Sequence, residues 1–287
     1  MIDPTVAAGT AGAIVAKGAS SAIESSTKKS DQLHAALLEE MKSTSGFKAA
    51  AKHKANRLEM KEGLFNWLLR PLFWLNERQS EYYTENFADD MAAKLAHVDV
   101  ENVVPPEPNI GIQAMEGLAY SLDSPELKDM YLELLATASD KVHQSEAHPS
   151  FASIIRQLSP REAVRLPDFL QVEPFGTVAN VMLTAKHGGQ RYLESHVPSL
   201  YDDVTNEMIV EPNMASMIDN WTRLGQVNVK YKSWSPDADA YAYMETRPEY
   251  LKWKSHYSAN PDVRVTIQPG IIHPTDFGRL FKRAVLR

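Results

Sequence analysis

The sequence predicts a mainly α-helical protein with a small β component, in which a helical N-terminal half precedes a winged-helix-like α+β C-terminal half. Two observations support this fold class. Helical composition and helix-start signals dominate the first half of the chain. Alternating apolar side chains then indicate strands at 227–234 and 263–267, between a helix that ends at Gly225 and another that begins after Thr275. The order helix, strand, insertion, strand, helix is the one expected of a winged-helix-like unit.

The length of 287 residues exceeds the usual size of one domain. We expect a helical lead-in over residues 1–60, a helical domain over 61–160 and a winged-helix-like domain over 161–287. Charge is distributed unevenly: residues 1–150 carry 14 basic and 22 acidic side chains, whereas 151–287 carry 16 and 15. Because neither half is basic in bulk, any contact with nucleic acid should be local.

Residues 5–23 are rich in alanine, glycine, serine and threonine. Asp3 and Pro4 stand where a signal peptide would have basic residues, so we do not expect secretion. Small side chains contribute little transfer energy, which argues against a membrane span, although small residues at intervals of four are typical of close-packed membrane helices. We expect a soluble small-residue helix or frayed arm, with membrane contact as the alternative.

Residues 31–60 are helical in composition, and an apolar-rich segment follows at 64–75, where Pro71 should kink or divide the helix. This segment is too short to span a bilayer but is suited to its interface. A helix–helix seam inside the protein is the favoured interpretation. Contact with a membrane or a partner is the alternative, through the aromatic side chains of Phe65, Trp67, Phe73 and Trp74.

A proline-rich segment at 102–109 should interrupt the helices, and the sequence predicts two helix starts after it. Ser124 followed by Pro125 predicts a helix over 125–142, because a serine hydroxyl can cap the first turn and proline suits its first position. Ser159 begins a capping box with Glu162. These signals define structure and carry no chemistry.

The second half mixes helix and strand signals. Residues 177–184 read as a strand, and Gly188-Gly189 follows as a turn. Asn213 should cap the helix that closes at Gly225, and Thr275 should cap the last helix. The segment 235–262 between the two alternating strands is polar and aromatic, and we expect it to be an excursion.

Chemical signatures are sparse. The chain has no cysteine, which excludes disulfides, thiolate metal sites and a cysteine nucleophile. It contains no GxSxG elbow, no GxxxxGK[ST] phosphate loop and no GxGxxG. We therefore expect a protein that is not an enzyme and that uses no cofactor.

One polar cluster contains candidate metal ligands, His143, Glu146 and His148. Imidazole and carboxylate both suit zinc, but two histidines five residues apart do not share one helical face. The favoured interpretation is structural, with His143 complementing a helix C-terminus.

Four stretches resemble the abortive-infection alpha (Abi-alpha) family, a bacterial domain family associated with phage defence. They are VVPPEPNIGIQAMEGLAYSLDSPELKDMYLELLATASD, AHPSFASIIRQLSPREAVRL, IDNWTRLGQV and IIHPTDFGRLFKRAV, which begin at residues 103, 147, 218 and 271. The resemblance implies a cytosolic bacterial protein that arrests or kills an infected cell or helps to sense infection. It brings no catalytic residues.

Three functions remain open. The first is a non-enzymatic effector, sensor or adaptor that contacts a protein partner or a second copy in the cytoplasm. The second is a membrane-active effector at the inner membrane, using residues 5–23 and 64–75. The third, which we rank lowest, is a winged-helix nucleic-acid binder with the helix at 213–225 in the groove. Its candidate phosphate contacts are Arg223, Lys230, Lys232, Lys252 and Lys254.

Overall fold

The computed structural model describes residues 77–286 apart from residue 238. The expected helical lead-in and the apolar segment at 64–75 lie outside the described residues. The first part of the described chain, residues 77–175, is helical, and we call it the helical body. Its elements are α4 (Glu77–Glu85), α5 (Phe87–Lys94), η1 (Val100–Asn102), α6 (Pro108–Ala119), α7 (Pro125–Ala138), η2 (Gln144–Glu146), α8 (Phe151–Arg156) and α9 (Pro160–Leu170).

The remaining chain combines helices with one antiparallel sheet. The sheet has four strands in the order β2-β1-β4-β3, and every neighbouring pair is antiparallel. Its elements are β1 (Gly176–Ala185), β2 (Gln190–Pro198), α10 (Met214–Arg223), β3 (Val227–Lys230), η3 (Ala242–Thr246), α11 (Pro248–His256), β4 (Val263–Pro274) and α12 (Asp276–Val285). We call β1, β2 and β4, together with η3 and α11, the arm.

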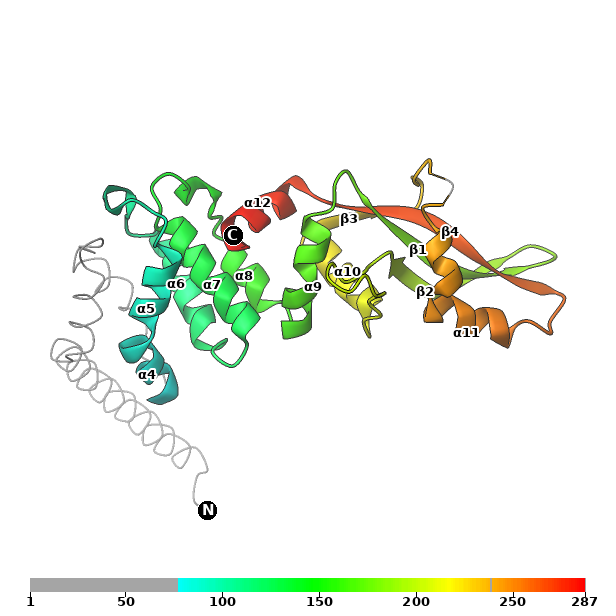
Figure 1. The fold of residues 1–287 in the computed structure, drawn as a ribbon, viewed down its shortest axis with the longest axis horizontal. Helices are drawn as coiled ribbons and strands as arrows, with labels where there is room; N and C mark the ends of the chain where they lie inside the picture. Colours follow the sequence, from blue (N-terminus) through cyan, green and yellow to red (C-terminus); the bar gives the residue numbers. More distant parts are fainter. Residues whose placement is uncertain (1–76, 238, 287) are drawn as a thin grey trace, which may run out of the picture.

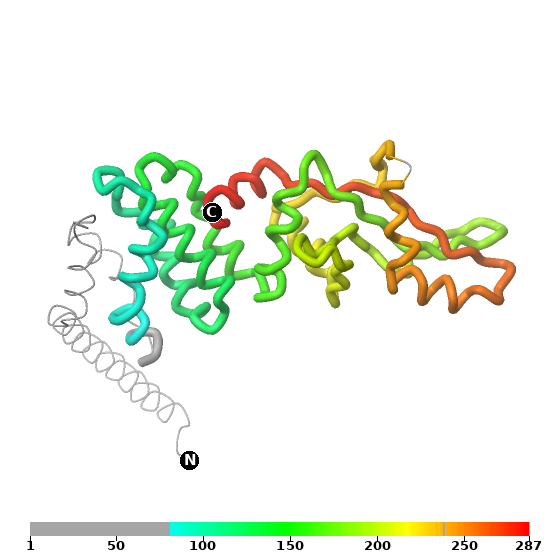
Figure 2. Tube along the Cα trace, in the orientation of Figure 1, coloured from blue at the N-terminus to red at the C-terminus, as the bar shows by residue number. Residues whose placement is uncertain are grey.

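The described part of the chain is elongated, with the helical body at one end and the arm at the other (Figure 1). The backbone trace shows β1, β2 and β4 extending away from the body, while α12 turns back towards it (Figure 2). The C-terminus therefore lies beside the body and far from the tip of the arm.

One large hydrophobic core joins the helical body to the inner end of the sheet. It contains fully buried side chains from α5, α7, α10 and α12, among them Phe87, Leu134, Trp221 and Phe281. Helix α7 lies in its middle, because every residue from Met130 to Ala138 is buried. The expected domain division at residue 160 stays a prediction, and the packing core continues across it.

A second, smaller core lies within the arm. Ala179, Val181 and Val197 of the sheet pack against Tyr243, Met244 and Tyr250 of the insertion. The odd-numbered side chains of β1 therefore face η3 and α11. This follows from the two-residue period of a strand, which sends alternate side chains to opposite faces.

Helix α12 closes the fold by packing on the body. The Thr275 side chain accepts a hydrogen bond from the Gly278 N–H at 2.8 Å, as expected of an N-cap. Thr137 of α7 donates to the Ala284 carbonyl at 3.0 Å. Gly278 permits close contact with the chain before β3, since a Cβ at this position would lie 2.0 Å from the Gln226 carbonyl oxygen.

The mainly helical α+β fold class is confirmed for the described residues, as are the Ser159 capping box and the Thr275 cap. Gly225 ends α10 with a positive φ of 71°. The expected caps at Ser124 and Asn213 are not made by their side chains. Their helices still begin where the sequence predicts.

The winged-helix-like expectation is not supported. β4 pairs along all of β1, and β1 forms a hairpin with β2, so the sheet is larger than a two-stranded wing. β3 is a four-residue edge strand, and the insertion after it forms η3 and α11. The sequence analysis missed β2, because register shifts opposite Val181 interrupt its alternation.

Replacing Gly278 by alanine should destabilise the protein. Helix propensity alone favours alanine by about 1 kcal/mol, but the added Cβ would overlap the Gln226 carbonyl. We expect a net loss of about 2 kcal/mol in the free energy of unfolding, measured by urea denaturation. Arg279→Ala on the exposed side of the same helix is the control and should change stability by less than about 0.5 kcal/mol. Equal or greater stability of Gly278→Ala would contradict the packing described.

Stability should also fall at alkaline pH because of buried tyrosines. Burial raises the pKa of Tyr131 to about 12, and its hydroxyl donates to the Ala152 carbonyl at 3.1 Å. The folded state therefore keeps this proton above pH 10, where the unfolded chain releases it, so the stability it contributes is lost as pH rises from about 10 to 12. Urea midpoints across that range should fall less steeply for Tyr131→Phe than for the parent protein. Parallel curves would contradict this assignment.

Candidate functional site

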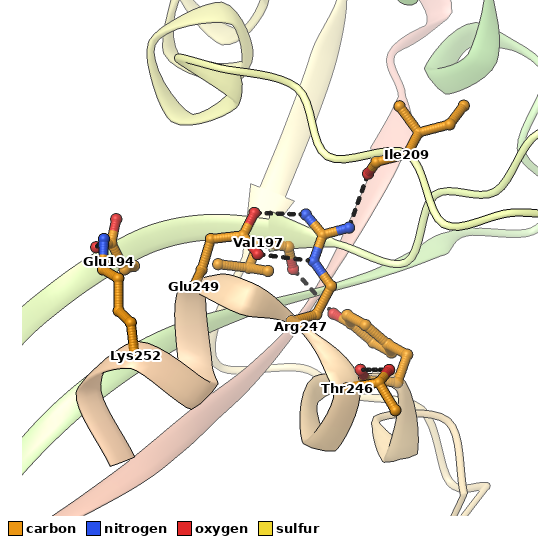
Figure 3. Close-up of polar contacts among 8 residues, drawn as sticks. Glu194, Val197, Ile209, Thr246, Arg247, Glu249 and Lys252 are labelled. Carbon is orange, nitrogen blue, oxygen red and sulfur yellow. Dashed lines mark hydrogen bonds and ion pairs between the residues drawn. The ribbon is translucent and has the colours of Figure 1, made fainter. Parts of the chain in front are cut away.

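Arg247 is the most deeply buried cation in the described part of the chain, with 1% of its surface exposed. It lies at the start of α11 and binds Glu249 with two hydrogen bonds, Nε to Oε2 at 3.1 Å and Nη2 to Oε1 at 2.6 Å. Its Nη1 donates to the Ile209 carbonyl at 2.8 Å (Figure 3). A planar guanidinium can satisfy a carboxylate and a carbonyl at once. Arg247 therefore fastens the 199–212 loop to the insertion.

Two tyrosines attach the insertion to the sheet next to this cation. The Tyr243 hydroxyl donates to the Val197 carbonyl at 2.9 Å, and the Tyr241 hydroxyl donates to the Gly270 carbonyl at 2.9 Å. Burial raises the pKa of Tyr243, so its hydroxyl remains a donor well above neutral pH. The insertion is thus held by hydrogen bonds as well as by the second core.

A second polar group lies on the opposite face of the sheet, at its inner end. His196 of β2 places its Nε2 3.2 Å from Asp219 Oδ1 of α10, and the Tyr231 hydroxyl lies 2.9 Å from its Nδ1. A neutral imidazole with its proton on Nε2 would donate to the carboxylate and accept from the phenol. The three side chains connect helix α10, strand β2 and the segment after β3.

The backbone of His196 is held in a left-handed conformation, with φ of 53°. Non-glycine residues adopt this region at some energetic cost, and surrounding contacts must impose it. Here the His196 N–H donates to Asn180 Oδ1 at 3.0 Å, and Asn180 Nδ2 donates to Gln268 Oε1 at 3.0 Å. Buried Asn180 therefore directs the imidazole towards its two partners.

Tyr231 lies directly over Gly270 of β4. A Cβ at position 270 would lie 2.6 Å from the Tyr231 ring, so the ring can occupy this place only above glycine. Burial raises the pKa of the Tyr231 hydroxyl. The carboxylate, imidazole and hydroxyl resemble an acid–base relay in composition. A phenol that stays protonated acts here as a donor rather than as an activated nucleophile.

The residues of the candidate metal cluster each have a different neighbour. His143 Nδ1 lies 2.6 Å from Asp140 Oδ2, His148 Nδ1 lies 2.6 Å from Ser150 Oγ, and Glu146 Oε1 lies 3.3 Å from Arg283 Nε. Across residues 77–286, residue 238 aside, no group of three or more His, Cys, Asp or Glu side chains is placed to hold a metal ion.

The predicted phosphate contacts come from α10, from β3 and the segment after it, and from α11. Lys252 is paired with Glu194, and Lys254 lies 2.8 Å from Glu245. Arg223 donates to the side chains of Gln157 and Asn220. Lys230 and Lys232 are exposed on and after β3. Nucleic-acid binding by this set stays a prediction.

The membrane candidates Phe65, Trp67, Phe73 and Trp74 lie outside the described residues, as does the 5–23 stretch. Within the described chain, none of the helices combines the length and apolar character that a bilayer crossing requires. The membrane-active alternative therefore remains a hypothesis about the first 76 residues.

Sequence reasoning missed Arg247, His196 and Tyr231. Arg247 precedes Pro248, which correctly marks a helix start, but no local pattern distinguishes a buried arginine from an exposed one. His196 and Tyr231 are separated by 35 residues, and only the sheet pairing brings them together. The alternation in the predicted strand 227–234 put Val229 and Tyr231 on one side, without identifying a partner for the tyrosine.

The fold and these contacts define an α+β protein with a helical body and a sheet-based arm. Its sequence matches the family model "Abortive infection alpha" over residues 79–285. This match spans well over half of the chain, so the protein belongs to the abortive infection alpha family, which associates it with phage defence. Searches among curated proteins and solved structures found no match.

Replacing Arg247 by methionine should destabilise the protein by about 3 kcal/mol or more, because Glu249 and the Ile209 carbonyl lose their buried partner. The double variant Arg247→Met/Glu249→Leu should recover part of this loss, since the unpaired carboxylate is removed as well. Urea denaturation measures both. As the control, Arg279→Met removes a more exposed pair with Asp276 and should cost less than about 1 kcal/mol. Equal losses for Arg247→Met and Arg279→Met would contradict the role of Arg247.

Proposed function

We propose that the protein is an abortive-infection effector or sensor that acts through protein–protein contact, and that Trp234 anchors the contact. The observation that carries this proposal is the exposure of Trp234, 64% of whose surface is open to solvent. The partner is another protein or a second copy of this chain. A few residues carry most of the binding energy at protein interfaces, and tryptophan, tyrosine and arginine are enriched among them.

Hydrogen bonds hold the backbone directly after Trp234 to the sheet. The Ser235 N–H donates to the Tyr241 hydroxyl at 3.1 Å, and that hydroxyl donates to the Gly270 carbonyl of β4. Figure 1 shows the loop between β3 and η3 projecting from the sheet. An anchor that is already positioned loses less conformational entropy on binding than one on a loose loop.

Other apolar side chains are exposed in the segments beside the arm. Val204 and Val210 belong to the 199–212 loop and are 94% and 48% exposed. Arg247 holds this loop through the Ile209 carbonyl, next to Val210. These side chains supply apolar surface that a partner could cover in addition to Trp234.

Phage challenge tests this function. Cells that express the protein should release fewer phage per infected cell from a panel of phages, without better survival of the infected cells. Trp234→Ala should restore the phage yield to that of cells without the gene, while its thermal unfolding midpoint stays within a few degrees of the parent value.

The matched control is Tyr120→Ala, which removes an aromatic side chain of 68% exposure from the helical body. It should leave protection unchanged. Full protection by Trp234→Ala would reject the anchor, and unchanged phage yield with the parent protein across the panel would count against the defence role itself.

A further inference from the structure

The outer half of the sheet has one face that η3 and α11 do not cover. Cross-strand partners share a face, so the pairing of Tyr192 with Met182 and of Met182 with Thr266 places these side chains together. Gln190, Thr184 and Arg264 form the next row towards the tip. The second core faces the other way, through Ala179, Val181 and Val265. We call the surface with the Tyr192 and Arg264 rows the outer sheet face.

Aromatic, cationic and hydrogen-bonding groups meet on the outer sheet face. Tyr192 is 58% exposed, and Arg264 and Lys186 are exposed at its tip. In the described part of the chain, no ion pair involves either of these two cations. Two strand spacings, about 10 Å, separate the Tyr192 and Arg264 strands.

Polar side chains between these groups and in the next row inwards are hydrogen-bonded to one another. The Thr184 and Thr266 hydroxyls lie 3.0 Å apart, and Asn180 donates to Gln268 one row further in. Met182, between Tyr192 and Thr266 in the first row, is only 5% exposed, so neighbouring side chains cover it. The surface is therefore a firm platform with an exposed aromatic ring beside two cations.

The body repels an anionic ligand more strongly than the region of the arm does. The helical body carries 7 basic and 18 acidic side chains over residues 77–175, whereas residues 176–275 carry 9 basic and 11 acidic ones. A polyanion is therefore repelled less near the arm, where the exposed Arg264 and Lys186 at the tip attract it locally. Two acidic residues belong to neighbouring segments, Asp262 just before β4 and Asp219 of α10.

We infer that the outer sheet face binds single-stranded nucleic acid, with a base stacked on Tyr192 and the phosphates beside Arg264 and Lys186. Every base has a flat face that can stack on an aromatic ring, and arginine and lysine neutralise the backbone. A flat sheet surface requires unstacked bases, so a duplex should bind less well. This site goes beyond the proposed protein contact and uses other residues.

Fluorescence anisotropy with the full-length protein tests the inference, using labelled 20-nucleotide oligo(dT) and oligo(U) and a duplex of equal length. We expect salt-dependent binding of the single strands and weaker binding of the duplex. Tyr192→Ala should weaken single-strand binding about tenfold, whereas Tyr192→Phe should retain it, because stacking requires the ring and not the hydroxyl.

Arg264→Gln should reduce the slope of log affinity against log salt concentration by about 0.7, the value for one phosphate contact on a single strand. Lys141→Gln is the matched control. Lys141 is also exposed, but it lies in the helical body, away from the sheet. It should leave both affinity and slope nearly unchanged. Thermal unfolding of each variant separates lost binding from lost folding.

Several results would overturn the inference. They are an absence of binding at low salt, equal affinity for the duplex, or a loss of affinity for Lys141→Gln as large as that for Arg264→Gln. Binding of phosphatidylglycerol vesicles or self-association in sedimentation, lost in Tyr192→Ala without any binding of oligonucleotides, would assign the surface to a membrane or a second copy instead. The phage-yield test of Trp234 is independent of all these outcomes.

Discussion

The continuous path from β4 into α12 is the constraint on which the rest of the structure depends. β4 pairs with β1 over residues 263–272 and with β3 over residues 271–274, so its inner end lies inside the sheet. It ends at Pro274, and Thr275 starts the helix that packs on α7. A long strand of the arm and the closing helix of the body thus belong to one uninterrupted segment. The arm cannot reorient without disturbing the main core.

Polar contacts order the parts of the arm that this segment does not hold directly. The second core contains few side chains and cannot by itself order a long insertion, so Arg247, Tyr241 and Tyr243 fasten it through backbone carbonyls. On the other face, side-chain oxygens make the contacts. Asn180 Oδ1 of β1 accepts from the His196 N–H of β2, and the His196 ring contacts Asp219 of α10. A buried polar group is costly unless it is satisfied. Each contact therefore favours one arrangement of loops over its alternatives and leaves the arm well defined despite its small core.

Features that depend on residues close together in the sequence were predictable, and features that depend on residues far apart were not. Local signals located α7, α9, α10 and α12, because proline, serine, threonine and glycine act within one helical turn. Sheet membership was harder, since β2 has a bulge and β4 continues through Pro269 and Gly270. The polar contacts were not predictable at all. Arg247 meets Ile209 across 38 residues, and only the finished fold supplies that neighbour.

The helical body and the region of the arm differ in surface charge and in exposed aromatic side chains, and the two proposed binding surfaces lie in the region of the arm. The body buries its apolar side chains in one core and presents an acidic surface, which suits solubility and repels anionic ligands. Residues 176–275 are close to electrically balanced, with 9 basic and 11 acidic side chains. Tyr192 of the arm and Trp234 in the loop after β3 are exposed, on backbone that strand pairing or hydrogen bonds hold in place. Binding to such positions requires little further ordering of the protein. The conformational entropy of the backbone that carries these side chains is therefore lost during folding. Burial of apolar side chains in the main core, which β4 and α12 connect to the arm, compensates for that loss.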